Sequence, residues 1–499
     1  MTLSPTCEPA PLAQTYVDTV LAPLYGITKR FFAAAMREID RAHLVVATEC
    51  GVLSIDVAHI LADGLAALDT VPVPETYDRR YEDYFFVREA ALAAAVGADV
   101  AGFLHVGRSR NDLDHTMFRM ILRERIDALR TEGLALAQTL LGLVRREQRT
   151  LIVAYTHGQP AQPTTYGHYL AAVLEILLRD LARLAAARAD VDLCPLGAAA
   201  ITTSGFPLDR KRAAALLGFA APLENSYACI AGVEDLTATY SALEIMFLHL
   251  GRFVQDLGVW AGFDVGQLRL PSAWVQISSI MPQKRNPVAI EHLRLLASHA
   301  MGRARAVIGT LHNTPFTDIN DSEAETHAQG YGAFDLGMRV LVLLRGMLPA
   351  ASVDVGRVRR NIDASLITVT ELADTMVRQE GLSFRSAHAV AGTFAQAVLA
   401  DTTTPRPDGY ATFREAFKRM VGRPPALDES SFHAALSPEN FVSVRSRLGG
   451  PAEAAITAAC ERYAASITRL EADATADAER VHAAAAMLDA AMSRLLPAA

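Results

Sequence analysis

Residues 122–143 read LRERIDALRTEGLALAQTLLGL, and small or apolar residues recur in this stretch at alternating spacings of four and three. Such spacing returns side chains to one helix face, so it predicts a long helix with one continuous buried seam. The same rhythm returns between Leu236 and Leu257. The two seams consist of Leu122, Ile126, Leu129, Gly133, Leu136, Leu140 and Leu143, and of Leu236, Tyr240, Leu243, Phe247, Leu250, Val254 and Leu257.

Other helical stretches surround these two. Ile230–Phe263, if continuous, would be about 50 Å long at roughly 1.5 Å per residue. With residues 122–143 and 230–263, the stretches 166–187, 287–311 and 329–349 make five long helices. Five such helices predict an elongated bundle. Their apolar character extends beyond one face, so we expect some of that surface to be buried in a homo-oligomer. Shorter helices are predicted over Tyr25–Cys50, Val52–Leu68 and Tyr81–Val96, and one closing helix or a pair without chemistry over Ala452–Ala499.

The composition is that of a globular protein. The chain has 499 residues, of which 51% are hydrophobic and 20% charged, with a formal net charge of -8. This length predicts roughly two to four domains or subdomains. Mild acidity without a basic cluster argues against a nucleic-acid partner. The five cysteines show neither metal-ligand nor disulfide spacing, and no leader or membrane span is visible, so we expect a cytoplasmic protein without a metal site and without membrane association.

Residues 278–287 read SSIMPQKRNP and are followed by Glu291. Hydroxyls, cations, amides and two prolines together are typical of a loop tip. A deprotonated Ser278 could act as a base, and Lys284 and Asn286 could stabilise negative charge on a carboxylate. Taken alone, the stretch is more typical of an ordinary exposed loop between helices than of a catalytic site.

Three further polar segments are candidates for a site. Residues 105–112 (HVGRSRND) place two arginines and an amide beside a predicted helix start, which suits an anion or simply a capped helix. Residues 155–165 (YTHGQPAQPTT) hold His157 in a loop where prolines and a glycine should stop regular structure; it could transfer a proton or be structural. The small residues at 195–200 and 204–207 let backbone approach a ligand or another helix closely.

In combination these segments resemble the aspartase/fumarase superfamily and, within it, the argininosuccinate lyase family. The resemblance covers roughly residues 80 to 450 and is carried by the four segments above and by three motifs nearer the C-terminus. The matching residues are Glu82-Asp83, His105–Asp112, Thr156–Pro163, Pro195–Gly197, Gly205–Arg210, Ser278–Pro287 with Glu291, Glu371–Asp374, Ser383–His388 and Leu436–Phe441.

The resemblance implies an all-α protein of three domains, which we expect at residues 1–112, 113–364 and 365–499. The central domain would supply five long helices to a homotetrameric twenty-helix core. Each site would be built by loops of three subunits, so a monomer would be inactive. The implied reaction is reversible trans elimination of an amine from an N-substituted aspartate to give fumarate, with neither metal nor organic cofactor.

The resemblance also implies roles for individual residues. Ser278 would abstract the Cβ proton, and Lys284 and Asn286 would hold the carboxylate that gains electron density. His157, paired with Glu291 of another subunit, would lie near the reacting centre; it is one candidate for protonating the amine. The expected substrate-binding residues are Ser109, Arg110, Asn111, Thr156, Gln159, Ser279, Met281 and Asn286.

The sequence departs from the family pattern in three places. Ile277 replaces the usual glycine and Val106 a threonine. Argininosuccinate lyases bind the arginine end of their substrate with the pattern Tyr-x-x-Asp-x-Gln-x-x-Lys. At the equivalent place this sequence keeps only the aspartate. Glutamate for lysine there disfavours an amino-acid carboxylate and favours a cationic amine. We expect amine specificity to lie in Asp318, Asn320, Asp321 and Glu323, with Pro315 in the place of the tyrosine.

These departures favour a member similar to ethylenediamine-N,N'-disuccinate lyases, which release fumarate from aminocarboxylic acids. The first alternative is a true argininosuccinate lyase. The second, of another class, is a catalytically silent structural homologue such as a lens crystallin. The set of Ser278, Lys284, Asn286, His157 and Glu291 argues against that last alternative, because a structural protein has no physical need for it.

Overall fold

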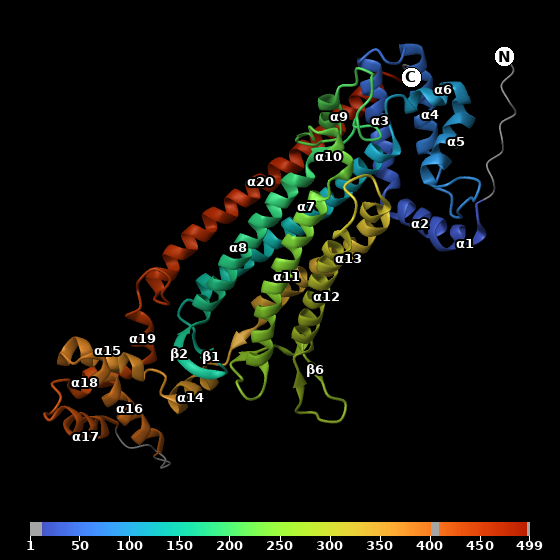
Figure 1. The fold of residues 1–499 in the computed structure, drawn as a ribbon. Coiled ribbons are helices and arrows are strands. Elements are labelled where there is room, and N and C mark those ends of the chain that lie inside the picture. The colour runs from blue at the N-terminus through green and yellow to red at the C-terminus, as the bar shows by residue number, and fades with distance from the viewer. Residues whose placement is uncertain (1–11, 401–408, 497–499) are drawn as a thin grey trace, which may run out of the picture.

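The computed structural model describes residues 12–400 and 409–496. It confirms the all-α fold: helices dominate, and the strands within the described ranges form four two-stranded pairs. Long helices lie lengthwise against one another in the middle of the molecule (Figure 1), and five of them form the central bundle. These are α7 (Arg110–Arg146), α8 (Tyr166–Val191), α11 (Glu234–Ala261), α12 (Val288–Leu311) and α13 (Ala324–Met347).

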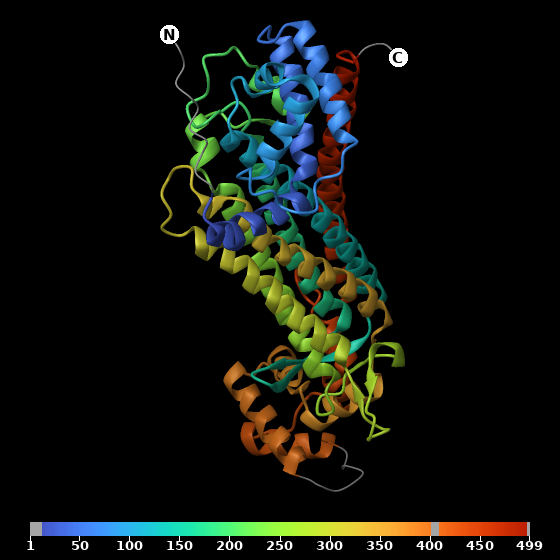
Figure 2. The ribbon, with the colours of Figure 1, turned by 90° about the vertical axis from the view of Figure 1, so that its right-hand side faces the viewer.

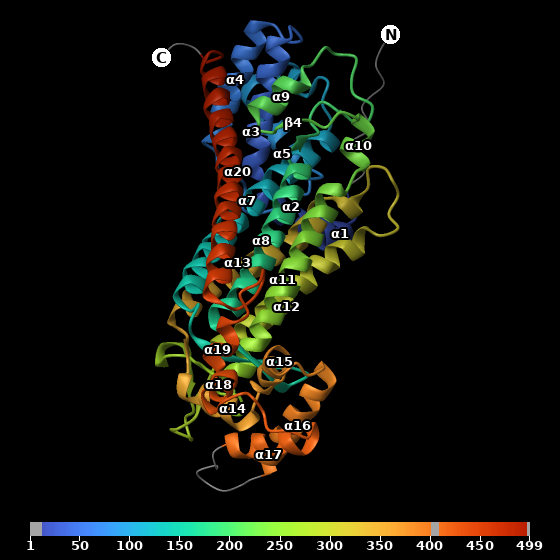
Figure 3. The same cartoon turned by 90° about the vertical axis from the view of Figure 1, so that its left-hand side faces the viewer.

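Smaller helices gather at the two ends of this bundle, as Figures 2 and 3 show from opposite sides. One end carries α1 (Gln14–Tyr16), α2 (Ala22–Phe31), α3 (Ala33–Glu49), α4 (Ile55–Asp69), α5 (Tyr84–Val96), α6 (Ala98–Gly102), α9 (Arg210–Leu216) and α10 (Ser226–Ala231). The other end carries α14 (Val355–Ser365), α15 (Val369–Glu380), α16 (Phe384–Ala400), α17 (Gly409–Val421), α18 (Glu429–Leu436) and α19 (Pro438–Ser443).

The strands are short and local. The hairpin β1 (Leu151–Thr156) and β2 (Gln159–Thr165) is antiparallel, as are β5 (Leu268–Arg269) with β8 (Ser352–Val353) and β6 (Gln276–Ile277) with β7 (Arg285–Asn286). The pair β3 (Leu193–Cys194) and β4 (Ala221–Pro222) is parallel. Single 3-10 turns occur at Phe103–His105, Ser272–Trp274, Asn320–Ser322 and Leu348–Ala350, and a π-turn at Val17–Leu21.

Both predicted seams are confirmed. All seven seam residues of α7 and all seven of α11 are buried, and together with α8, α12 and α13 they form the main hydrophobic core. A second core joins the N-terminal helices, and a third joins α15 to α18. Helical periodicity alone therefore identified which faces of α7 and α11 are buried.

The C-terminal prediction of one closing helix or a pair resolves to a single helix, α20 (Glu453–Ser493). It packs along α7 and α8 and ends in the N-terminal core through Leu488 and Met492. One helix therefore ties two cores together. The division at 112/113 and 364/365 stays a prediction.

Several predicted boundaries are wrong. Ile230–Phe263 is not one helix: Gly232 and Val233 separate α10 from α11, and a Cβ on Gly232 would meet the Ala228 carbonyl oxygen at 2.6 Å. Tyr25–Cys50 is broken at Phe32, which is fully buried against Phe118. The predicted irregular loop at 155–165 is mostly the β1–β2 hairpin, with a register shift between Ala154 and Tyr155.

Close packing of α11 on α13 depends on glycine. A Cβ on Gly337 would lie 2.2 Å from the Phe247 ring. We therefore expect Gly337→Ala to lower the free energy of unfolding by about 1–3 kcal/mol through overpacking. Gly142→Ala, on α7 with nothing within 4 Å, is the matched control and should raise it by about 0.5–1 kcal/mol. Thermal unfolding of both variants measures the difference; equal melting temperatures would contradict the packing argument.

Among the described residues, no helix combines the length and apolar character required to cross a bilayer.

Candidate active site

The first group of predicted site residues lies at the N-terminus of α7. Ser109 is the N-cap: its hydroxyl accepts from the Asn111 N–H at 3.4 Å, and its own N–H donates to Asp112 at 2.9 Å, which forms a capping box. Arg110 and Asn111 therefore occupy the first helical turn, where unpaired N–H groups and the helix dipole favour an anion.

Asp112 joins this turn to the segment at 195–200. Its carboxylate also accepts from the N–H groups of Gly197 at 2.8 Å and Ala199 at 2.9 Å. Burial raises the pKa of Asp112 to about 6, although these donors oppose the shift. The Asn111 side chain donates to the Ala200 carbonyl at 3.0 Å. The small-residue segment thus supports the anion turn directly.

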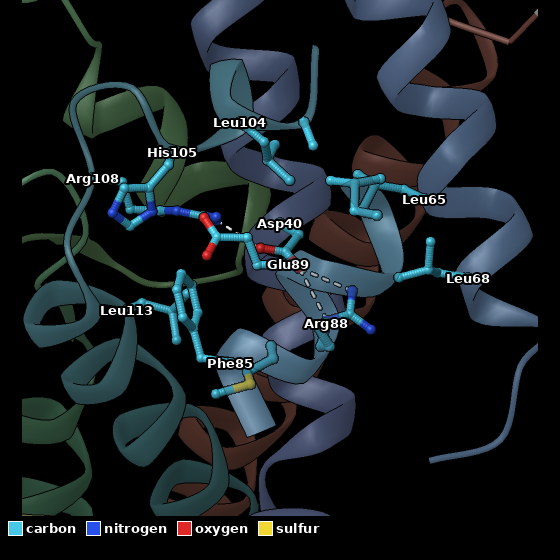
Figure 4. A pocket seen from close by; sticks show the side chains of 13 residues that line it. Asp40, Leu65, Leu68, Phe85, Arg88, Glu89, Leu104, His105, Arg108 and Leu113 are labelled. Atoms are coloured by element: carbon cyan, nitrogen blue, oxygen red, sulfur yellow. Dashed lines mark hydrogen bonds and ion pairs between the residues drawn. The ribbon is translucent and has the colours of Figure 1, made fainter. Parts of the chain in front are cut away.

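A buried ionic network on α3 holds the same turn from the other side. Asp40 accepts from Arg88 at 2.9 Å and from Arg108 at 2.7 Å, and Figure 4 shows its carboxylate between the two. Burial opposes ionisation of Asp40, but the two guanidinium groups outweigh it and hold its pKa below the usual value. His43 lies 3.1 Å from the Val106 carbonyl; burial lowers the pKa of His43 to about 3, so the neutral ring donates through Nε2. Neither Asp40 nor His43 was predicted, because their contacts with Arg88, Arg108 and Val106 bridge 48 to 68 residues of sequence.

Carboxylates surround Arg110. Its guanidinium pairs with Asp83 at 2.6 Å and lies 3.9 Å from Asp114. Burial raises the pKa of Asp114 well above its ordinary value, against the opposing effect of Arg110 and in concert with Glu323, Asp83 and Asp318. Burial also raises the pKa of Glu323, and Asp318 adds to that shift. One arginine and four mutually close carboxylates therefore share this region.

The structure thus brings Asp318 and Glu323 close to Arg110, and their role in amine specificity stays a prediction. His115, one turn along α7, lies 4.0 Å from Asp318, and burial lowers the pKa of His115 to about 4. The sequence did not lead us to predict Asp114 or His115. The spacing of four residues between Arg110 and Asp114 could have indicated an ion pair on one helix face. Asn320 and Asp321 are exposed.

The second group forms a loop at 278–287, here called the lid. Ser278 Oγ accepts from the N–H groups of Ile280 at 3.4 Å and Met281 at 3.1 Å. The Ser278 N–H donates to the Lys284 carbonyl at 3.3 Å. Backbone donors at Oγ stabilise negative charge on that oxygen. Ser278 and Asn286 are half-buried, whereas Ser279, Met281, Lys284 and Glu291 are exposed.

The third group is the tip of the β1–β2 hairpin. His157 and Gly158 occupy its two central positions with φ of 54° and 75°, as a type I′ turn requires. The turn presents Thr156, His157 and Gln159 to solvent. Thr165 at the end of β2 caps α8, so the hairpin is fixed to the bundle at that end.

Within one chain the Arg110 turn lies at the opposite end of the bundle from the hairpin tip. Arg110 begins α7 and the hairpin follows its end, so 37 residues at roughly 1.5 Å each separate them by about 55 Å. Glu291 lies in the first turn of the 24-residue helix α12, and Asp318 follows the end of that helix, so these two residues are also far apart. Figure 1 places the hairpin and β6 at the end of the bundle away from the N-terminal helices.

Comparisons with known proteins identify relatives over almost the whole chain. Residues 86–302 match the Lyase family, and residues 366–443 match the argininosuccinate lyase C-terminal family. The chain is 52% identical to argininosuccinate lyase 2 of Agrobacterium fabrum, over 95% of this chain and 94% of that protein. It is 37% identical to argininosuccinate lyase of Methanoculleus marisnigri, over 86% of each.

Solved structures of related lyases share the fold of this chain. An EDDS lyase variant with bound fumarate superposes with a TM-score of 0.84 at 26% identity, over 97% of this chain and 99% of that one. The class II fumarase of Schistosoma mansoni shares the fold, with a TM-score of 0.65 at 14% identity, over 83% of this chain and 90% of that one.

Proposed function

Because the chain belongs to the argininosuccinate lyase family of the aspartase/fumarase superfamily and is a fumarate-forming carbon–nitrogen lyase, we propose that it acts on N-substituted aspartates whose amine half is cationic. The observation that carries this proposal is the surplus of carboxyl groups around Arg110; burial raises the pKa of Asp114, Asp318 and Glu323, and a cationic ligand would favour their ionised form. Asp83, Asp114, Asp318 and Glu323 lie close to one guanidinium. Such a pocket attracts an ammonium group and repels the carboxylate of an amino acid.

We further propose that the protein is a homotetramer in which three chains complete each site. One chain contributes Ser109, Arg110 and Asn111 with the carboxylates, a second the hairpin residues Thr156, His157 and Gln159, and a third the lid and Glu291. The separation of about 55 Å along α7 supports this arrangement. Exposed apolar side chains on the bundle, such as Leu248 at 43% and Leu295 at 52%, supply surface for the association.

In the proposed reaction Ser278 removes a proton from Cβ. The electron pair moves into the adjacent carboxylate, which Lys284 and Asn286 hold as it gains charge. Collapse of this intermediate breaks the C–N bond, forms the double bond of fumarate and releases the amine, for which His157 is the candidate proton donor. A free serine hydroxyl is far too weak a base at neutral pH, and Lys284 with the two lid N–H groups would lower its pKa. A cytoplasmic location stays a prediction.

The second candidate function is the elimination of arginine from argininosuccinate. It is favoured by the two relatives named argininosuccinate lyase at 52% and 37% identity. Fumarate absorbance in the ultraviolet separates the candidates when argininosuccinate is compared with N-alkyl aspartates that carry an additional ammonium group and no further carboxylate. Ethylenediamine-N,N'-disuccinate, whose amine half carries two carboxylates, tests whether the pocket tolerates these groups. Efficient turnover of argininosuccinate alone would exclude the cationic-amine proposal.

Reversing the charge at position 323 tests the pocket itself. Glu323→Lys is expected to lower kcat/KM for cationic-amine substrates by about ten- to a hundredfold, because it removes one attractive charge and adds a repulsive one. The ratio of kcat/KM for argininosuccinate to kcat/KM for the cationic-amine substrates should rise. Glu325→Lys, an exposed position in the first turn of α13, is the matched control and should leave both values unchanged. Equal effects of the two substitutions would show that Glu323 does not face the amine.

A further inference from the structure

A cavity of about 600 Å³ lies at the base of the lid; the lid residues Arg285 and Pro287 line it, but none of the residues given a catalytic or substrate-binding role does. The end of α11, strand β5 and the start of α14 form its walls, at the lower end of the bundle in Figure 1. Positive side chains outnumber negative ones in its lining, which contains four arginines and one aspartate. These residues are Arg269, Arg285, Arg357, Arg360 and Asp354.

Only one of the four guanidinium charges is neutralised by the aspartate. Arg269 pairs with Asp354 at 2.9 Å. Arg357 donates to the carbonyls of Phe263 at 3.1 Å and Asp264 at 2.8 Å, which fixes the side chain but leaves its charge uncompensated. Within the described ranges Arg360 is exposed and makes neither a hydrogen bond nor an ion pair.

Arg285 connects the cavity to the lid. It belongs to β7, where it pairs with Ile277 directly before Ser278. Its guanidinium donates to Ser272 Oγ and to the Leu270 carbonyl, each at 3.2 Å. A ligand that engages Arg285 from the cavity therefore acts on the strand pair from which the lid projects.

We propose that this cavity binds a small multivalent anion, a diphosphate or a tricarboxylate, and that binding stabilises the base of the lid through Arg285. Guanidinium groups bind phosphate and carboxylate through paired hydrogen bonds. A concave surface with positive charge focuses the field, which is notable in a chain whose formal net charge is -8. The fumarate-forming reaction needs no such anion, so the inference goes beyond the proposed function.

Isothermal titration of the full chain with sodium diphosphate and with citrate, at fixed ionic strength, tests the site without relying on activity. Both anions carry enough charge to engage several arginines. Saturable binding with one site per chain is expected. Fluorescence of Trp274, which lies beside Ser272, should change over the same concentration range. Binding of diphosphate alone identifies a phosphate site, and binding of citrate alone a carboxylate site; either result supports the proposal.

Two variants locate the binding. The double variant Arg269→Gln with Arg360→Gln should lose about tenfold or more in affinity, because it removes two of the guanidinium groups that would bind the anion through charge-assisted hydrogen bonds. Arg359→Gln on the same helix is the matched control, because Arg359 pairs with Glu439 and does not line the cavity. It should bind like the natural chain. Absence of saturable binding, or unchanged affinity in the double variant, would overturn the site.

Amide hydrogen exchange measures whether anion binding in the cavity stabilises the lid. Bound anion should slow exchange of the amides at 278–287 in the natural chain and leave them unchanged in the double variant. Saturable binding without slowed exchange would overturn the coupling through Arg285 and leave only the anion site.

Discussion

Ser278→Ala is expected to lower fumarate formation by about a thousandfold or more, because it removes the proposed general base and with it the acceptor for the Cβ proton. The fold should survive, since Ser278 is half-buried and its Oγ accepts only from two N–H groups within the lid. Steady-state rates with a cationic-amine substrate, together with circular dichroism and the mass of the assembly, measure both parts of this expectation.

The neighbouring hydroxyl gives the matched control. Ser279→Ala changes an exposed residue of the same lid and should cost less than about tenfold in rate, as expected for a substrate contact without a proton-transfer role. Unchanged activity of Ser278→Ala would exclude this serine as the base. Mixing Ser278→Ala chains with Arg110→Gln chains should restore part of the activity, because some sites of a mixed tetramer would contain neither substitution.

Asp40→Ala is expected to have the largest effect on stability. It removes the only carboxylate bonded to the buried Arg88 and Arg108 among the described residues, and leaving buried charges unpaired costs about 3–5 kcal/mol. Asp63→Ala, which alters an exposed residue of α4, should change stability by less than about 0.5 kcal/mol. Thermal unfolding of the two variants gives the comparison; similar melting temperatures would show that the network contributes little.

The pH dependence of Asp40 follows from the direction of its shift. Its pKa in the folded protein lies below that of an unfolded carboxyl. The unfolded chain therefore takes up a proton first as the pH falls, so the stabilisation is complete above the unfolded pKa and is lost towards the folded one. At neutral pH it is fully present. The difference in stability between the natural chain and Asp40→Ala should accordingly shrink only in acid.

Much of the fold was predictable because its signals are local. The seams of α7 and α11 repeat every turn, and the motif residues at 105–112 and 278–287 are recognisable by type alone. The errors occur where distant packing overrides a local pattern. Pro160 and Pro163 suggested an irregular loop, yet their partners in β1 make them strand residues. At Phe32, packing against Phe118 coincides with a break in a stretch that reads as continuous helix.

The sequence by itself determined which side chains face the core of the bundle and which residue types are available for chemistry, including a glutamate at position 323. Both are encoded within a few turns or a single loop. Only the tertiary structure decided which of these residues lie together. Glu323 and Asp318 reach Arg110 from another helix and loop, whereas His157 lies about 55 Å away along α7. Proximity across hundreds of residues depends on how the long helices pack, and no local pattern carries that information.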